Sequence, residues 1–169
     1  MNRQRLLACA FAGALSVLPP SFASAGRTTL TGAQLPNTRT SSPAVVKVAF
    51  NSKLRAKIVV DGKGRTLYML NADSSGTPTC AQLDPVCPKV WPALTSQGPP
   101  KAGPGINAAL LAIVKGASGV PQVAYNKHPL YYFAGGHGTG AGDKKPGEAK
   151  GQNFEYSWFV LTPKGNPIR

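Results

Sequence analysis

The clearest pattern in the chain is a pair of short β-rich runs separated by a turn, and this pattern occurs twice. The first pair is residues 57–61 and 66–70 around the turn 62–64, and the second is residues 122–125 and 130–133 around the turn 126–127. Glycine in the first turn and Asn126 in the second suit the left-handed backbone that tight turns require. The pattern therefore predicts two β-hairpins.

The two predicted hairpins look like copies of one unit. At a constant offset of 63 residues, four apolar or aromatic positions coincide: Val60, Leu67, Tyr68 and Leu70 fall on Val123, Leu130, Tyr131 and Phe133. Trp91–Thr95 likewise echoes Trp158–Thr162 at an offset of 67. We predict a mainly β fold, in which residues 45–169 form one small domain of two divergent β-hairpin repeats, at about 56–95 and 120–165. Short helical turns fit Cys80–Trp91, and residues 107–113 fit a helical turn that runs into a strand.

The N-terminus has the three-part pattern of an export signal. Arg3 and Arg5 precede an apolar run over residues 6–18, which is too short to span a bilayer, and small residues at Ala23 and Ala25 suit signal peptidase. We predict a signal peptide at residues 1–25 and, from its Thr, Ser, Pro and Gly content, a flexible tether at 26–44. The mature chain is expected to be periplasmic or extracellular, without a membrane span.

Charge narrows the class of partner. The chain carries a net charge of +13, and removal of the signal peptide takes away two arginines and no acid, which leaves +11. Such a charge attracts anions such as lipid phosphates, lipopolysaccharide and wall polymers. Only Lys144 and Lys145 are adjacent basic residues in the mature chain. We therefore expect an anionic envelope component rather than nucleic acid.

Two cysteines remain in the mature chain, Cys80 and Cys87. An even pair in an oxidising compartment indicates a disulfide. The six-residue spacer between them differs from the two-residue spacing of redox and zinc motifs, so a metal or redox pair is the weaker alternative.

Several blocks in order resemble a known family. These blocks are Thr66–Asp73, the two cysteines, Val90–Leu94, Tyr125–Phe133, Asp143–Gly147 and Trp158–Leu161. They are similar to bacterial secreted-repeat proteins, predicted lipoproteins with a Tyr-x-(Phe/Trp/Tyr)-x-x-Asp motif. The resemblance covers about residues 56–165 and implies an exported β-rich tandem repeat of unassigned role. The chain departs from the motif at Leu70 and at a Gly-rich insertion over 136–142.

The motif supplies the candidate functional residues, which are Tyr68, Asp73, Trp91, Tyr131, Tyr132, Phe133, Asp143 and Trp158. Most of the aromatic side chains fit a core, whereas strand alternation places Tyr132 on the face opposite its neighbours and makes it the better exposed contact. The two motif aspartates either cap backbone N–H groups in turns or form a paired anionic ligand site.

The remaining chemistry is sparse. His137 and Asp143 are weak candidates for a metal, and the Gly-rich loop lacks the helix start of a phosphate cradle. No Gly-x-Ser-x-Gly elbow occurs, so neither an enzyme nor a cofactor is expected. The sequence predicts an exported, non-catalytic binding or accessory domain with a cationic surface. The alternative is an envelope redox accessory protein that docks to a cytochrome or binds a metal or haem.

Overall fold

The computed structural model describes residues 42–73 and 76–169, so the predicted signal peptide and all but the last three residues of the predicted tether lie outside the described residues. The fold is mainly β, as predicted. Its strands are β1 (Val45–Asn51), β2 (Ala56–Asp61), β3 (Tyr68–Leu70), β4 (Lys101–Ala102), β5 (Leu111–Lys115), β6 (Pro121–Tyr125), β7 (His128–Pro129) and β8 (Trp158–Val160). Its helices are α1 (Cys80–Leu83), α2 (Cys87–Val90) and the 3-10 turns η1 (Ala108–Leu110) and η2 (Ala117–Gly119).

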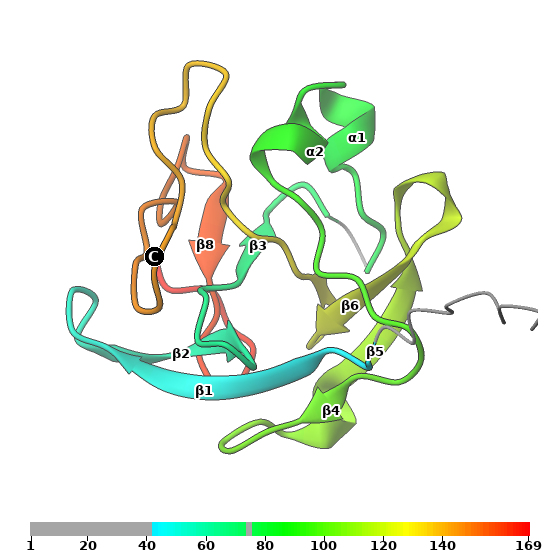
Figure 1. The fold of residues 1–169 in the computed structure, drawn as a ribbon, viewed down its shortest axis with the longest axis vertical. Coiled ribbons are helices and arrows are strands. Elements are labelled where there is room, and N and C mark those ends of the chain that lie inside the picture. Colours follow the sequence, from blue (N-terminus) through cyan, green and yellow to red (C-terminus); the bar gives the residue numbers. More distant parts are fainter. Residues whose placement is uncertain (1–41, 74–75) are drawn as a thin grey trace, which may run out of the picture. The chain divides into compact units, whose positions relative to one another are not determined.

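The strands form three small sheets (Figure 1). One has the order β2-β1-β4, the second pairs β3 with β8, and the third has the order β5-β6-β7. The helices α1 and α2 fill the stretch in which short helical turns were predicted. Residues 107–113 form a 3-10 turn that leads into β5, as the sequence suggested.

The second predicted hairpin is confirmed. Strands β6 and β7 pair antiparallel, and the turn residues Asn126 and Lys127 have φ angles of 49° and 66°. Two consecutive positive φ angles are the signature of the tight turn whose twist matches that of paired strands. Asn126 also donates a side-chain hydrogen bond to the carbonyl of Gly165, which ties the turn to the C-terminal segment.

The first predicted hairpin is only partly correct. The turn at 62–64 exists, and the Leu67 N–H donates to the Val59 carbonyl. However, β2 pairs along its length with β1, a strand that the sequence analysis missed, and β3 leaves to pair with β8. Each strand has backbone N–H and C=O groups along two edges that need hydrogen-bond partners, and segments outside the predicted hairpin supply most of these partners.

Hydrogen bonds recur at matched positions in the two halves. Val59 accepts from Leu67 and donates to the Leu161 carbonyl, while Val123 accepts from Leu130 and donates to the Leu94 carbonyl. Val59, and not Val60 as the constant offset predicted, is therefore the counterpart of Val123, because the first turn is one residue longer than the second. The two motif tyrosines, Tyr68 and Tyr131, exchange backbone N–H to carbonyl bonds with each other. This symmetry agrees with a repeat, which stays a prediction.

The core consists of two apolar clusters, and the two faces of β3 contribute to different ones. Tyr68 and Leu70 belong to the first cluster together with both tryptophans, whereas Met69 belongs to the second, as does Leu67, the residue before β3. The segment 130–133 alternates in the same way, because Tyr131 and Phe133 lie in the first cluster whereas Leu130 lies in the second. The predicted alternation is thus realised, and it fixes where the motif side chains point.

Candidate functional site

Five aromatic motif residues, Tyr68, Trp91, Tyr131, Phe133 and Trp158, meet in the first apolar cluster, around two stacked tryptophans. The rings of Trp91 and Trp158 are parallel, with centroids 3.9 Å apart. Tyr68 presents its ring to Trp91 at 5.4 Å, and Tyr131 presents its ring to Trp158 at 5.2 Å. All four side chains are buried, so this part of the motif forms core, as expected for aromatic residues in strands.

One motif tyrosine pairs with the motif aspartate of the other half. The Tyr68 hydroxyl donates to Asp143 Oδ2 at 2.6 Å and accepts from the Gly151 N–H at 3.2 Å. The second carboxylate oxygen of Asp143 accepts from the Lys150 N–H at 2.9 Å. Burial, and next the bond to Asp143, raises the pKa of the Tyr68 hydroxyl. We call Tyr68 and Asp143 the closed pair.

Tyr131 and Asp73 form the opposite crossed pair, and this pair is not joined. Asp73 Oδ1 accepts from the backbone N–H and the hydroxyl of Thr79, at 2.7 and 2.8 Å. Its Oδ2 atom and the Tyr131 hydroxyl are buried and have no hydrogen-bond partner among the residues that the structure describes. Burial, and next the nearby Asp73 carboxylate, raises the pKa of the Tyr131 hydroxyl and the nearby Gln122 amide lowers it, although neither side chain meets hydrogen-bond geometry with the hydroxyl. We call Tyr131 and Asp73 the open pair.

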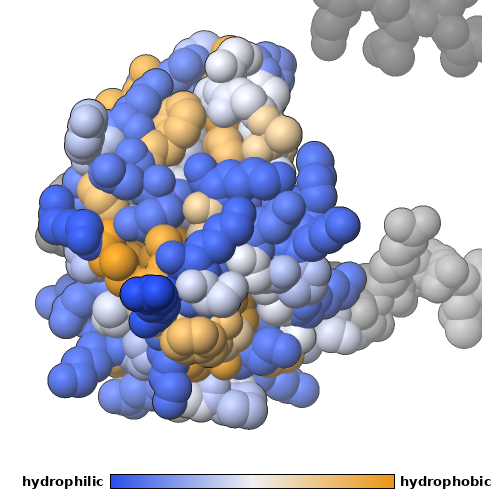
Figure 2. Space-filling view, turned by 90° about the vertical axis from the view of Figure 1, so that its left-hand side faces the viewer, coloured by the Kyte–Doolittle hydropathy of each residue, from blue (hydrophilic) through white to orange (hydrophobic). Residues whose placement is uncertain are grey.

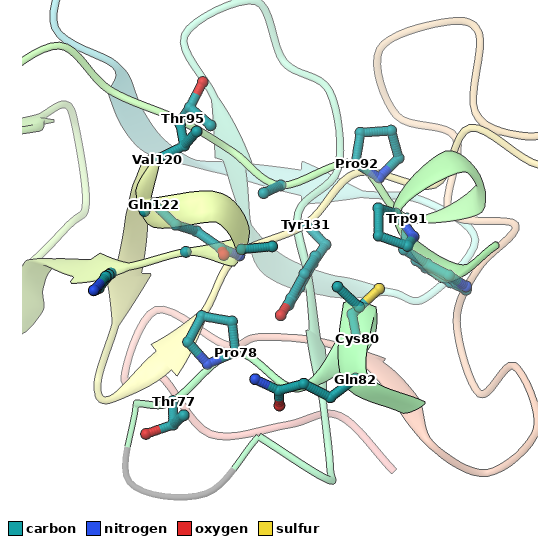
Figure 3. A pocket seen from close by; sticks show the side chains of 17 residues that line it. Thr77, Pro78, Cys80, Gln82, Trp91, Pro92, Thr95, Val120, Gln122 and Tyr131 are labelled. Atoms are coloured by element: carbon teal, nitrogen blue, oxygen red, sulfur yellow. The ribbon is translucent and has the colours of Figure 1, made fainter. Parts of the chain in front are cut away.

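The open pair adjoins a pocket of about 770 Å³, which we call the Tyr131 pocket. Figure 3 shows the Tyr131 hydroxyl pointing into the space between the lining side chains. The walls come from the chain around α1 and α2 and from the segment that joins β5 to β6, and they include Pro78, Ala81, Pro92, Ala117 and Val120. Trp91 also lines the pocket, together with the buried Gln122. The pocket is thus mainly apolar, with a polar hydroxyl at its inner surface.

The disulfide predicted between Cys80 and Cys87 is present and links α1 to α2. Each of these helices has only four residues, too few to be stable alone. Cys80 is buried and lines the Tyr131 pocket. The bridge therefore holds one wall of the pocket in place.

Tyr132 points away from Tyr131, as the alternation predicted, but it is half-buried and contacts other side chains of the protein. Its hydroxyl donates to Asp61 Oδ2 at 3.0 Å, and the Arg65 guanidinium lies 4.0 Å from its ring centroid. Arg65 also forms an ion pair with Asp61 at 2.8 Å. These contacts assign Tyr132 to a local network beside the first turn.

Backbone hydrogen bonds within the Gly-rich loop pair some of its own N–H and C=O groups. The Gly136 N–H donates to the Gly140 carbonyl, and the Thr139 N–H donates to the Gly136 carbonyl. At the neck of the loop, a Cβ built on Gly142 would lie 2.1 Å from the Ala134 carbonyl carbon, so only glycine fits there. The glycines let the chain cross itself closely.

His137 and Asp143 do not share a site. His137 lines a second, smaller pocket of about 240 Å³ beside Trp158, whereas Asp143 belongs to the closed pair. Over residues 42–73 and 76–169, no group of three or more His, Cys, Asp or Glu residues could hold a metal.

The segment 112–162 matches a family model described as a secreted repeat of unknown function. The predicted resemblance is confirmed for this segment. The secreted-repeat segment carries Tyr131, Asp143 and Trp158, and thus one member of each crossed pair. No curated protein and no solved structure matches the chain. Within the described part of the chain, no helix is long and apolar enough to cross a membrane.

Sequence reasoning missed three parts of this site. Gly151 lies against the Trp91 ring and donates to Tyr68, yet a lone glycine outside a turn motif carries no signal. Thr79 and Gln122 were also missed, because their partners lie six and eight residues away along the chain, outside any local motif. The motif indicated which residues matter but not that the tyrosines and aspartates pair crosswise.

Proposed function

We propose that this protein is an exported, non-catalytic binding domain whose cationic surface binds an anionic component of the cell envelope. The observation that carries this proposal is that most acidic side chains are engaged in hydrogen bonds within the protein. Asp61, Asp73, Asp84, Asp143 and Glu148 all accept hydrogen bonds from the protein itself. Among the described residues, only the cations Arg65 and Lys150 form ion pairs. The other lysines and arginines thus contribute to a positive field with little local compensation.

One part of this surface has the composition of an envelope contact. The turn between β1 and β2 and its flanks form what we call the basic tip, which comprises Phe50, Lys53, Arg55 and Lys57. Phe50 is 66% exposed, and Lys57 is its cross-strand neighbour. Figure 1 places this turn at one end of the β1–β2 ribbon. Figure 2 shows the face on that side, where hydrophilic side chains surround smaller apolar patches.

An exposed aromatic ring among cations suits a surface of anionic head groups above an apolar layer. Each Lys or Arg close to such a surface contributes about 1 kcal/mol, and an aromatic ring can enter the interface. The buried side chain of Asn51 holds the turn, because its Oδ1 accepts from the Leu54 N–H and its Nδ2 donates to the Gly147 carbonyl. The basic tip is therefore presented on a fixed support.

Binding to lipid vesicles tests the proposal. We expect the protein to sediment with vesicles of phosphatidylglycerol and phosphatidylcholine, and to stay in the supernatant with vesicles of phosphatidylcholine alone. Added salt should weaken binding to the anionic vesicles. The triple variant K53Q/R55Q/K57Q should bind about a hundredfold more weakly, from about 1 kcal/mol per cation. The control K89Q/K101Q/K164Q removes the same charge from other exposed positions. Equal losses in both variants would refute the basic tip, and equal binding to both kinds of vesicle would refute the anionic partner.

Export has its own test. We expect the mature protein to start at Gly26, because small residues precede this position at Ala23 and Ala25. Intact mass of the protein recovered outside the cytoplasm measures the cleavage point. A lipid-modified Cys9 at the new terminus would contradict this expectation.

A further inference from the structure

Two buried tyrosines occupy matched places in the fold, and only one of them has its hydrogen bonds satisfied. Tyr68 and Tyr131 are each at most 2% exposed, and each presents its ring to one of the stacked tryptophans at nearly right angles. Their backbones pair with each other. The two sites therefore offer a comparison within one molecule.

The first carboxylate oxygen is satisfied in the same way in both pairs. Asp143 accepts from the Lys150 N–H, and Asp73 accepts from the Thr79 N–H. The next residue makes the difference. After Lys150, the Gly151 N–H donates to the Tyr68 hydroxyl oxygen. After Thr79, the chain enters helix α1, and among the described residues no group meets hydrogen-bond geometry with the Tyr131 hydroxyl, although the Asp73 carboxylate and the Gln122 amide lie close enough to shift its pKa.

A buried hydroxyl and a buried carboxylate oxygen without partners are unfavourable, because both have lost their bonds to water. A molecule that supplies the missing bond would therefore bind at a favourable point. The closed pair shows which two bonds such a pair can form: the tyrosine hydrogen goes to the aspartate, and the phenol oxygen accepts from an N–H. The open pair forms neither bond, and because its aspartate lies close enough to accept the tyrosine hydrogen, the donor to the phenol oxygen is the bond that a ligand would add.

The pocket around the hydroxyl determines the rest of the ligand. The walls are mainly apolar and include proline, alanine and valine side chains, which favours a mainly apolar ligand, while the polar part of the lining includes Thr77, Gln82, Thr95 and Lys115. Beside the hydroxyl, the nearby Asp73 carboxylate opposes an anionic group, since like charges repel strongly in a partly buried site, whereas Lys115 supplies a positive charge elsewhere in the lining. We propose that the Tyr131 pocket binds an uncharged, mainly apolar molecule that carries an O–H or N–H donor, which the Tyr131 hydroxyl oxygen accepts. This site is separate from the basic tip and does not rest on it.

Three probes of the same shape separate the donor from the apolar body. The probe 2-naphthol has an O–H donor and is uncharged at neutral pH, 2-methoxynaphthalene lacks the donor, and 2-naphthoate is anionic. Two-dimensional 1H–15N NMR of the mature protein follows the indole N–H of Trp91, which lines the pocket. We expect 2-naphthol to shift this signal in a saturable way. The other two probes should bind about five- to tenfold more weakly, the effect of one hydrogen bond.

The variant Tyr131→Phe should lower the affinity for 2-naphthol by the same factor and leave 2-methoxynaphthalene unaffected. It should fold, because the hydroxyl that it removes has no partner in the described structure. The matched control is Tyr68→Phe, which should keep the affinity for 2-naphthol. The proposal is overturned if 2-naphthol gives no saturable shift, if 2-methoxynaphthalene binds equally well, or if Tyr131→Phe binds 2-naphthol as the unmodified protein does. The basic-tip variant K53Q/R55Q/K57Q should bind 2-naphthol normally, so the two proposals fail independently.

Discussion

The closed and open pairs predict opposite effects for the same chemical change. Tyr68→Phe removes a hydroxyl that makes two hydrogen bonds, one of them to a carboxylate. Hydrogen bonds to charged groups contribute about 1.5–3 kcal/mol, and the substitution also deprives Asp143 Oδ2 and the buried Gly151 N–H of a partner. We expect Tyr68→Phe to lower the free energy of unfolding by about 2–4 kcal/mol.

Tyr131→Phe removes a hydroxyl of equal burial that makes no hydrogen bond within residues 42–73 and 76–169. The loss of an unsatisfied buried polar group is neutral or stabilising, so we expect no decrease and an increase of up to about 1 kcal/mol. The ring stays in both variants, and with it the edge contact to tryptophan. The comparison therefore isolates the hydroxyl groups.

The assay is urea unfolding at neutral pH with the disulfide intact, followed by tryptophan fluorescence. A shift of the midpoint at an unchanged slope reports stability alone. If both variants lose stability equally, the Tyr131 hydroxyl has a partner in solution and the distinction between the open and closed pairs is wrong. If neither loses stability, the closed pair is not a stabilising contact.

The other predictions concern the surroundings of the site. Trp91→Ala and Trp158→Ala should each lower the free energy of unfolding by about 3–5 kcal/mol, and the double variant should lose less than the sum because the two rings stack on each other. Thermal unfolding of all three variants checks this, and strict additivity would contradict the stack. Gly151→Ala should cost about 1–3 kcal/mol, because its Cβ would lie 2.7 Å from the Trp91 ring; urea midpoints measure the loss, and a neutral result would show that the ring can move. Reduction of the Cys80–Cys87 bridge should cost about 2.5 kcal/mol from loop entropy. Melting with and without reductant tests this value, thiol counting confirms the oxidation state, and an unchanged melting temperature would refute the structural role of the bridge.

Features that depend on residues close together in the chain can be predicted from the sequence. The turn at Asn126–Lys127 follows from side chains that tolerate a left-handed backbone, so the second hairpin was predictable. The disulfide was predictable because its two cysteines lie close together in a chain whose N-terminal pattern predicts export. The alternation of residues 130–133 likewise fixed which side chains face which cluster.

The long-range pairing of strands and of polar side chains depends on the complete fold. The turn at 62–64 predicted a hairpin of β2 with β3. In the fold, β2 pairs along its length with β1 instead, and β3 pairs with β8. The sequence places Tyr68 close to Asp73, yet the fold joins Tyr68 to Asp143. Whether a buried hydroxyl finds a partner depends on which segments pack around it, and that is set by the summed burial of the whole core. The open pair at Tyr131 therefore became visible only in the folded molecule.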